Sequence, residues 1–218
     1  MTSLLDSYKS VLKDFPEMDA EYGKMLFLAA GNPAGGILLC GLNPSLGNAI
    51  EQVDIPFKEF SGDFWNPVKA LVRNHLDETA YIDLFPLRKT VQTQFETLPL
   101  DFRARILEKT QEEIERLSPR LIVHLNAGSS YYWGPRGWMG YAMEDAGVGR
   151  IKGARLLRIK GFNLDCRNRV NTSFRDTCLK GTHILFYRML SSRYEKALPK
   201  ELRLGSEDLD RIWEHINK

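Results

Sequence analysis

The amino-acid sequence predicts an α/β protein, a three-layer α/β/α sandwich built around a central, mostly parallel sheet of four to five strands. Short apolar segments bounded by turn residues alternate along the chain with longer segments of helical periodicity. Polar side chains directly follow several of these apolar segments, as is typical of the carboxyl ends of parallel strands. Because 218 residues with 43% hydrophobic content can bury one sizeable core, we expect a single domain over residues 1–218.

The N-terminal half supplies the first helices and two strands. Residues 1–30 are expected to be helical, because their apolar side chains recur at helical spacing. These side chains are Leu4, Leu5, Tyr8, Val11 and Leu12. The turn residues "GNPAGG" precede "ILLC" at 37–40, which predicts a buried strand. A helix is expected to begin near Pro67, since proline suits a first helical turn, and "AYIDLF" at 80–85 predicts a second strand.

The C-terminal half continues the alternation. "LDFRARILEKTQEEIERL" at 100–117 predicts an amphipathic helix, and "RLIVHL" at 120–125 predicts a third strand. "ARLLRI" at 154–159 predicts a fourth strand. "GTHILFYRMLSSRYEKAL" at 181–198 predicts a helix that begins after a glycine. The closing helix is expected at 206–216, with a serine as its cap.

Cysteine usage and hydropathy indicate the compartment. The three cysteines, Cys40, Cys166 and Cys178, are odd in number and far apart, which argues against a disulfide framework and against a cysteine-ligated metal. No segment approaches the roughly 20 apolar residues of a membrane span. We therefore expect a cytoplasmic protein that does not contact a membrane. We also expect it to be a monomer that uses no metal and no cofactor.

The charge is unevenly distributed. Residues 148–175 contain eight Arg or Lys residues and one acidic residue, although the net charge of the chain is only +2. Such a stretch is typical of a surface that binds a polyanion, or else of a solvated edge with scattered counter-ions. The segment "YYWGPRGWMGY" adds five aromatic side chains and Arg136, which would stack on bases if exposed or form a small core if buried.

The segment "GLNPS" at 41–45 follows the first strand. Its Asn43 carries an acceptor and two donors but no titratable group, so it would position a reactant and would not abstract a proton. Asp83 and Asn126 follow the second and third strands in the same way. Because the carboxyl ends of parallel strands share one edge of a sheet, these three side chains are expected to converge. An ordinary turn at Asn43-Pro44 is the alternative.

"GLNPS" resembles the first motif of the uracil-DNA glycosylase superfamily, whose mismatch-specific and single-strand-selective branches carry a Gly-x-Asn-Pro version. "YIDLFPL" resembles the second strand motif of the single-strand-selective branch. "LIVHLNAGSS" and "GTHIL" take the places of the third strand and of the His-Pro-Ser loop. The resemblance covers residues 36–190 in the order of the elements, and only its first motif is close.

The resemblance implies a monofunctional, metal-free DNA base N-glycosylase acting on DNA with an extruded base. Gly41 and Pro44 would shape the loop, and Asn43 would hold the attacking water. Phe57 would stack on the base, unless it packs in the core. His183, expected near a helix N-terminus, would donate to the departing base, unless it is an ordinary surface histidine.

Asp83 departs from the family pattern, which has Asn at this position. An ionised carboxylate only accepts hydrogen bonds and would repel a uracil oxygen, so a different base or a protein that binds without cleaving becomes an alternative. Asp83 could also simply bind a backbone amide. A small-molecule hydrolase using Ser129 or Ser130 is a third alternative, although "AGSS" lacks the Gly-x-Ser-x-Gly elbow. The DNA contacts would come from Arg136, Arg150, Lys152 and Arg155, which would bind phosphates.

Overall fold

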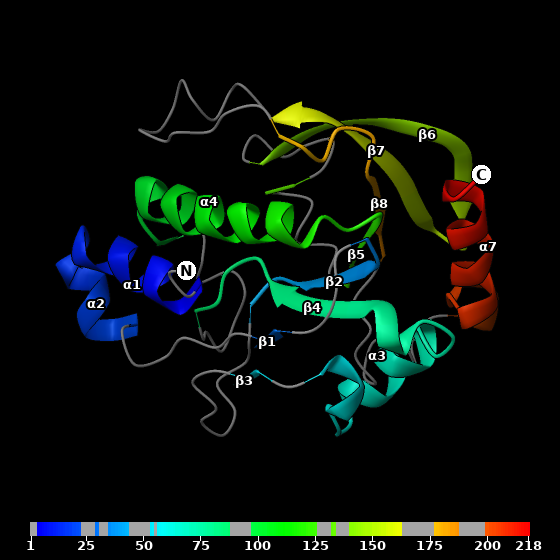
Figure 1. The fold of residues 1–218 in the computed structure, drawn as a ribbon, viewed down its shortest axis with the longest axis horizontal. Coiled ribbons are helices and arrows are strands. Elements are labelled where there is room, and N and C mark those ends of the chain that lie inside the picture. The colour runs from blue at the N-terminus through cyan, green and yellow to red at the C-terminus, as the bar shows by residue number, and fades with distance from the viewer. Residues whose placement is uncertain are drawn as a thin grey trace.

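A six-stranded mixed sheet forms the centre of the molecule, with the strand order β4-β2-β5-β8-β7-β6. The computed structural model describes residues 4–22, 29–30, 35–43, 53–54, 56–87, 97–125, 132–133, 140–162, 177–187 and 199–218. Figure 1 shows the sheet with helices on either side of it. The chain therefore belongs to the α/β class.

Four neighbouring strands of this sheet are parallel. They are β4 (Thr79–Asp83), β2 (Ile37–Gly41), β5 (Leu121–His124) and β8 (His183–Phe186). All residues of β2, β4 and β5 are buried, which explains why these strands appear in the sequence as short apolar runs without alternation.

The other two strands form a hairpin, β6 (Tyr141–Ile151) and β7 (Ala154–Phe162), in which β7 pairs antiparallel with both β6 and β8. The prediction of a sheet with four to five mostly parallel strands is thus wrong in its details, since the sheet has six strands and is mixed. Residues 183–186, predicted as helix, are strand β8, because pairing with β5 and β7 on both sides decides the state of this short apolar run.

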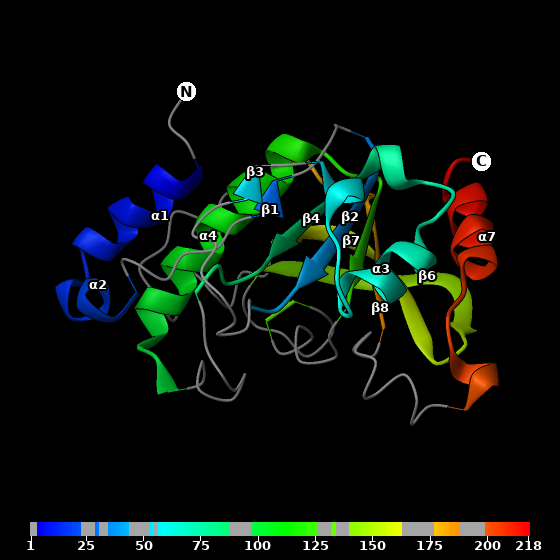
Figure 2. The same cartoon turned by 90° about the horizontal axis from the view of Figure 1, so that it is seen from below.

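Helices cover both faces of the sheet. On one face, α1 (Leu4–Lys13) and α4 (Leu100–Leu117) pack on Leu38 and Ile122, and α2 (Pro16–Tyr22) adjoins α1. On the other face, α3 (Trp65–Leu71) and α7 (Ser206–Ile216) pack on Leu39 and Val123. Figure 2 shows α1 and α2 at one end of the long axis and α7 at the other.

The remaining elements are short. β1 (Ala29–Ala30) pairs parallel with β3 (Val53–Asp54). Single turns of 3₁₀-helix are η1 (Phe57–Glu59), η2 (Leu76–Glu78) and η5 (Lys200–Leu202).

The β6–β7 hairpin bends where the pairing of its strands becomes irregular. The register shifts between Asp145 and Arg150, and Gly147 and Gly149 within this interval have φ angles of 78° and 69°. Such positive φ angles suit glycine because a Cβ atom would clash with the backbone. Figure 1 shows the hairpin curving alongside α7.

Candidate functional site

The order of the parallel strands points to the carboxyl end of β2. The chain passes from β2 to β4 on one side and then to β5 on the other side of β2. In open α/β sheets, ligand sites lie beyond the carboxyl ends of the strands where the order reverses in this way. At this point β2 ends at Gly41 and β5 ends at His124.

The structure brings Asn43 and Asp83 to the same edge of the sheet. Gly41 is the strand partner of Asp83, and the pairing continues beyond β4, where the Phe85 amide donates to the Leu42 carbonyl at 2.9 Å. Asn43 is the next residue and is half-buried. Pro44 and Asn126, also predicted here, lie outside the described residues.

The side chains of Asp83 and Tyr81 pack together over Gly41. The Tyr81 hydroxyl donates to Asp83 Oδ1 at 2.9 Å, and both side chains are buried. A Cβ atom at position 41 would lie 2.1 Å from Asp83 Oδ1 and 2.3 Å from the Tyr81 hydroxyl oxygen. These distances are far below van der Waals contact, so the glycine of "GLNPS" is required by the two side chains above it.

The environment of Asp83 alters its acidity. Burial raises the pKa of Asp83 to about 7, and the hydrogen bond from Tyr81 offsets only part of this effect. Burial and, next, the charge of Asp83 raise the pKa values of Tyr81 and Cys40. Near neutral pH the Asp83 carboxyl is therefore present in both protonation states, and its neutral form can donate as well as accept a hydrogen bond, as an amide does.

Phe57 is a core residue. It lies in η1 with 1% of its surface exposed and packs edge-on against Phe60 and Trp65, with ring centroids 5.9 and 6.0 Å away. Trp65 in turn packs edge-on against Tyr81 at 4.8 Å. Phe57 and Tyr81 thus belong to one hydrophobic cluster, linked through Trp65, and the buried ring of Phe57 favours the core alternative over a platform for a base.

The prediction that His183 lies near a helix N-terminus in a pocket with Asn43 is wrong. His183 is the first residue of β8 and the strand partner of Leu121, the first residue of β5. It therefore lies at the amino edge of the parallel strands, whereas Asn43 follows their carboxyl edge. Partial burial, then Arg158 and His215, lower the pKa of His183.

His124 is a residue near the site that the sequence did not reveal. It ends β5 beside Cys40, its strand partner, and is fully buried, with its ring stacked on Phe186 at 4.8 Å and edge-on to Trp133 at 5.2 Å. Neither ring nitrogen has a hydrogen-bond partner among the residues that the structure describes, and burial lowers the pKa of His124 to about 3, so the imidazole is neutral. Its only sequence signal is its place at the end of "RLIVH".

The basic residues predicted to bind DNA lie around the tip of the β6–β7 hairpin. Lys152 forms an ion pair with Asp208 of α7 at 2.7 Å, and Arg155 lies 3.5 Å from Asp145. Arg150 has no ion-pair partner in the part of the chain that the structure describes. Acidic neighbours thus compensate two of these charges, and Arg136 lies outside the described residues.

The described residues contain neither a candidate metal site nor a candidate membrane-spanning helix. They contain no group of three or more His, Cys, Asp or Glu side chains that would hold a metal ion. None of their helices combines the length and apolar character needed to cross a membrane. Cys40 is a buried free thiol, and Cys178 is an exposed one.

No protein-family model matches the chain, and no curated protein matches it.

Proposed function

We propose that the chain is a DNA base N-glycosylase whose site lies at the carboxyl ends of β2 and β4. The observation that carries this proposal is the Asp83 carboxyl, buried over Gly41 by Tyr81 at the edge where Asn43 follows β2. The segment "GLNPS" resembles the first motif of the uracil-DNA glycosylase superfamily. The helices on both faces of the sheet agree with the three-layer sandwich of that superfamily. The protein acts as a cytoplasmic monomer on DNA with an extruded base.

The chemistry asked of this site is the hydrolysis of an N-glycosidic bond. The bond between sugar C1′ and the base nitrogen breaks, the base departs with the electron pair as an anion, and a water molecule adds to the cationic sugar. The proton that this water loses is taken up by the departed base anion. The side-chain oxygen of Asn43 orients this water, and an oxocarbenium-like sugar is reactive enough to need only a positioned water. Neutral Asp83 recognises the base by donating to a carbonyl oxygen, which its ionised form would repel.

A second candidate function is nucleobase or DNA binding without cleavage. It is favoured by the position of His183 at the amino edge of the parallel strands, because this leaves the proposed site without the group expected to stabilise the departing base. In this alternative, Asp83 and Asn43 still recognise a base, and no glycosidic bond breaks.

A glycosylase assay distinguishes the two functions. Single- and double-stranded oligonucleotides carrying uracil, hypoxanthine, xanthine or a mismatch are incubated with the protein, and abasic sites are revealed by alkaline cleavage. We expect base release by the native chain and a loss of about a hundredfold or more in Asn43→Ala, because an unpositioned water reacts poorly. Unchanged DNA affinity of Asn43→Ala shows that the variant remains folded.

The outcomes separate clearly. Base release that persists in Asn43→Ala contradicts the role of Asn43. Binding without base release from any of these substrates supports the second function and contradicts the first. Absence of both binding and release contradicts both.

A further inference from the structure

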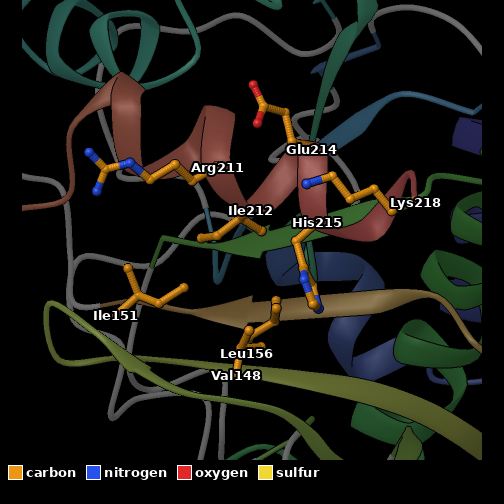
Figure 3. Close-up of a pocket in the computed structure, with 8 residues that line it drawn as sticks. All are labelled: Val148, Ile151, Leu156, Arg211, Ile212, Glu214, His215 and Lys218. Carbon is orange, nitrogen blue, oxygen red and sulfur yellow. The ribbon is translucent and has the colours of Figure 1, made fainter.

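A pocket of about 340 Å³ lies between α7 and the β6–β7 hairpin, apart from the site at the carboxyl ends of β2 and β4. Figure 3 shows the residues that line it. Its volume is at the lower end of the range of about 300–1,000 Å³ that is typical of small-molecule sites. The pocket is therefore large enough for one small ligand.

The floor of the pocket is aliphatic. Its apolar lining consists of Val148 and Ile151 from β6, Leu156 from β7 and Ile212 from α7. Val148 stands between the two glycines with positive φ, so the irregular part of β6 brings this side chain to the pocket. None of the described residues that line the pocket is Phe, Tyr or Trp, so the floor favours an aliphatic body over a stacked ring.

The polar lining is mainly basic. Among the described residues, Arg211, His215 and Lys218 line the pocket together with one acid, Glu214. Figure 3 shows His215 extending from α7 toward Leu156, whereas Glu214 points away from the strands. The polar group that extends toward the aliphatic floor is thus an imidazole, and Arg211 and Lys218 supply the positive charge of the lining.

A second histidine, His183, lies at the amino end of β8. Partial burial, then Arg158 and His215, lower the pKa of His183, so this imidazole is neutral near pH 7. Arg158 is paired with Glu144 at 2.9 Å, which compensates its charge. The positive charge at the pocket therefore comes from Arg211 and Lys218, which line it and would attract an anion bound beside the apolar floor.

We propose that this pocket binds a small aliphatic carboxylate, with its chain against Val148, Ile151, Leu156 and Ile212 and its head group at His215 and Lys218. The aliphatic floor supplies affinity through burial of apolar surface. The cationic groups distinguish a carboxylate from an alcohol or an amine of the same length. The inference does not depend on the proposed glycosylase activity.

Isothermal titration calorimetry with octanoate tests this proposal, with octan-1-ol and octylammonium as probes that keep the chain and change the head group. We expect saturable binding of octanoate, weaker binding of octan-1-ol and no binding of octylammonium. The double variant His215→Ala/Lys218→Ala should weaken octanoate binding by about tenfold, as expected for the loss of a charge-assisted hydrogen bond. Lys109→Gln, on α4 across the sheet, is the control for a lost positive charge and should bind as the native chain does.

Two variants of Val148 test whether octanoate binds in this pocket. Val148→Phe fills the pocket and should abolish octanoate binding, whereas Val148→Ala leaves it open and should retain binding. Thermal melts verify that both variants fold. If Val148→Phe fails to fold, the double variant His215→Ala/Lys218→Ala on α7 still tests the proposal. The proposal is overturned if octanoate fails to bind, if octan-1-ol binds as tightly, or if folded Val148→Phe binds octanoate normally.

Discussion

The carboxyl ends of β2 and β4 and the region between α7 and the hairpin are built in opposite ways. The first region is densely packed around a buried acid, and a single Cβ atom at Gly41 would collide with two side chains. The second encloses a basic pocket of about 340 Å³. A site can therefore be specified by close packing of neighbouring strands or by a cavity between elements distant in sequence.

The largest effect is expected from Asp83→Asn, measured as the pH dependence of stability. The pKa of Asp83 is raised from 3.8 to about 7 on folding, so the folded chain binds more protons than the unfolded chain between these values. Asp83 therefore contributes stability that is fully present below pH 4 and lost as the pH rises toward 7, with a slope of at most about 1.4 kcal/mol per pH unit.

Urea unfolding of the native chain and of Asp83→Asn at several pH values between 4 and 8 measures this slope. Asparagine keeps the acceptor for Tyr81 and cannot ionise, so the variant should gain stability relative to the native chain as the pH rises. If the unfolding free energies of the two proteins change with pH in parallel, burial does not destabilise the ionised Asp83 carboxylate, and the prediction is contradicted.

The next largest effect is expected from Gly41→Ala. The new methyl group would lie 2.1 Å from Asp83 Oδ1, so Asp83 and Tyr81 must shift, and overpacking of this kind costs about 1–3 kcal/mol. Gly205→Ala is the matched control, because its φ is −109° and its Cβ would lie 3.8 Å from Asp208. Equal melting temperatures for the two variants would contradict the close packing at Gly41.

A smaller effect is expected at the basic hairpin, measured as DNA affinity over a range of salt concentrations. Each phosphate contact that is lost should reduce the slope of log affinity against log salt by about 0.7 to 0.9. Arg150→Ala should flatten this slope more than Lys152→Ala, because Lys152 is already paired with Asp208. The triple variant Arg150→Ala/Lys152→Ala/Arg155→Ala should weaken binding to all sequences alike, and binding that is independent of salt would reject the basic surface.

The smallest effect is expected from Lys152→Ala on stability. The pair with Asp208 joins the hairpin to the first turn of α7, but Lys152 is 38% exposed, so we expect a loss below about 1 kcal/mol that shrinks with added salt. Lys58→Ala breaks a pair of the same 2.7 Å length whose side chains are 53% and 86% exposed, and it should leave the melting temperature unchanged. A larger loss in Lys58→Ala than in Lys152→Ala would contradict this ranking.

The strands of the first region could be predicted from the sequence because each is buried on both faces. "ILLC" is apolar throughout, and "AYIDLF" and "RLIVHL" are apolar except for Asp83, Arg120 and His124. Polar residues at or after the strand ends identified Asn43 and Asp83. "HILF" has the same character, but the residues after it have a helical pattern, so only its pairing in the sheet identifies it as β8. This ambiguity explains why His183 was wrongly predicted to lie near a helix N-terminus.

The region between α7 and the hairpin could not be predicted, because its sequence has no regular alternation of apolar and polar residues. β6 contains glycines and charged residues, and its exposure does not alternate regularly over its eleven residues. Its pocket needs the bend at Gly147 and Gly149 and the docking of α7, neither of which leaves a periodic signal. Within the first region, the contact of Asp83 and Tyr81 with Gly41 likewise depends on the strand register and on side-chain conformation.

The bend in β6 also bears on the solubility of the folded protein. β6 is the last strand of the six-stranded sheet, and the outer edge of such a strand is a template onto which another chain can add a strand. The register shift between Asp145 and Arg150 interrupts the row of backbone donors and acceptors there, and Glu144, Asp145 and Arg150 place charges along the same edge. Among the described strands, the irregularity that shapes a pocket on one side thus makes the outer edge of β6 a poor template for edge-to-edge aggregation.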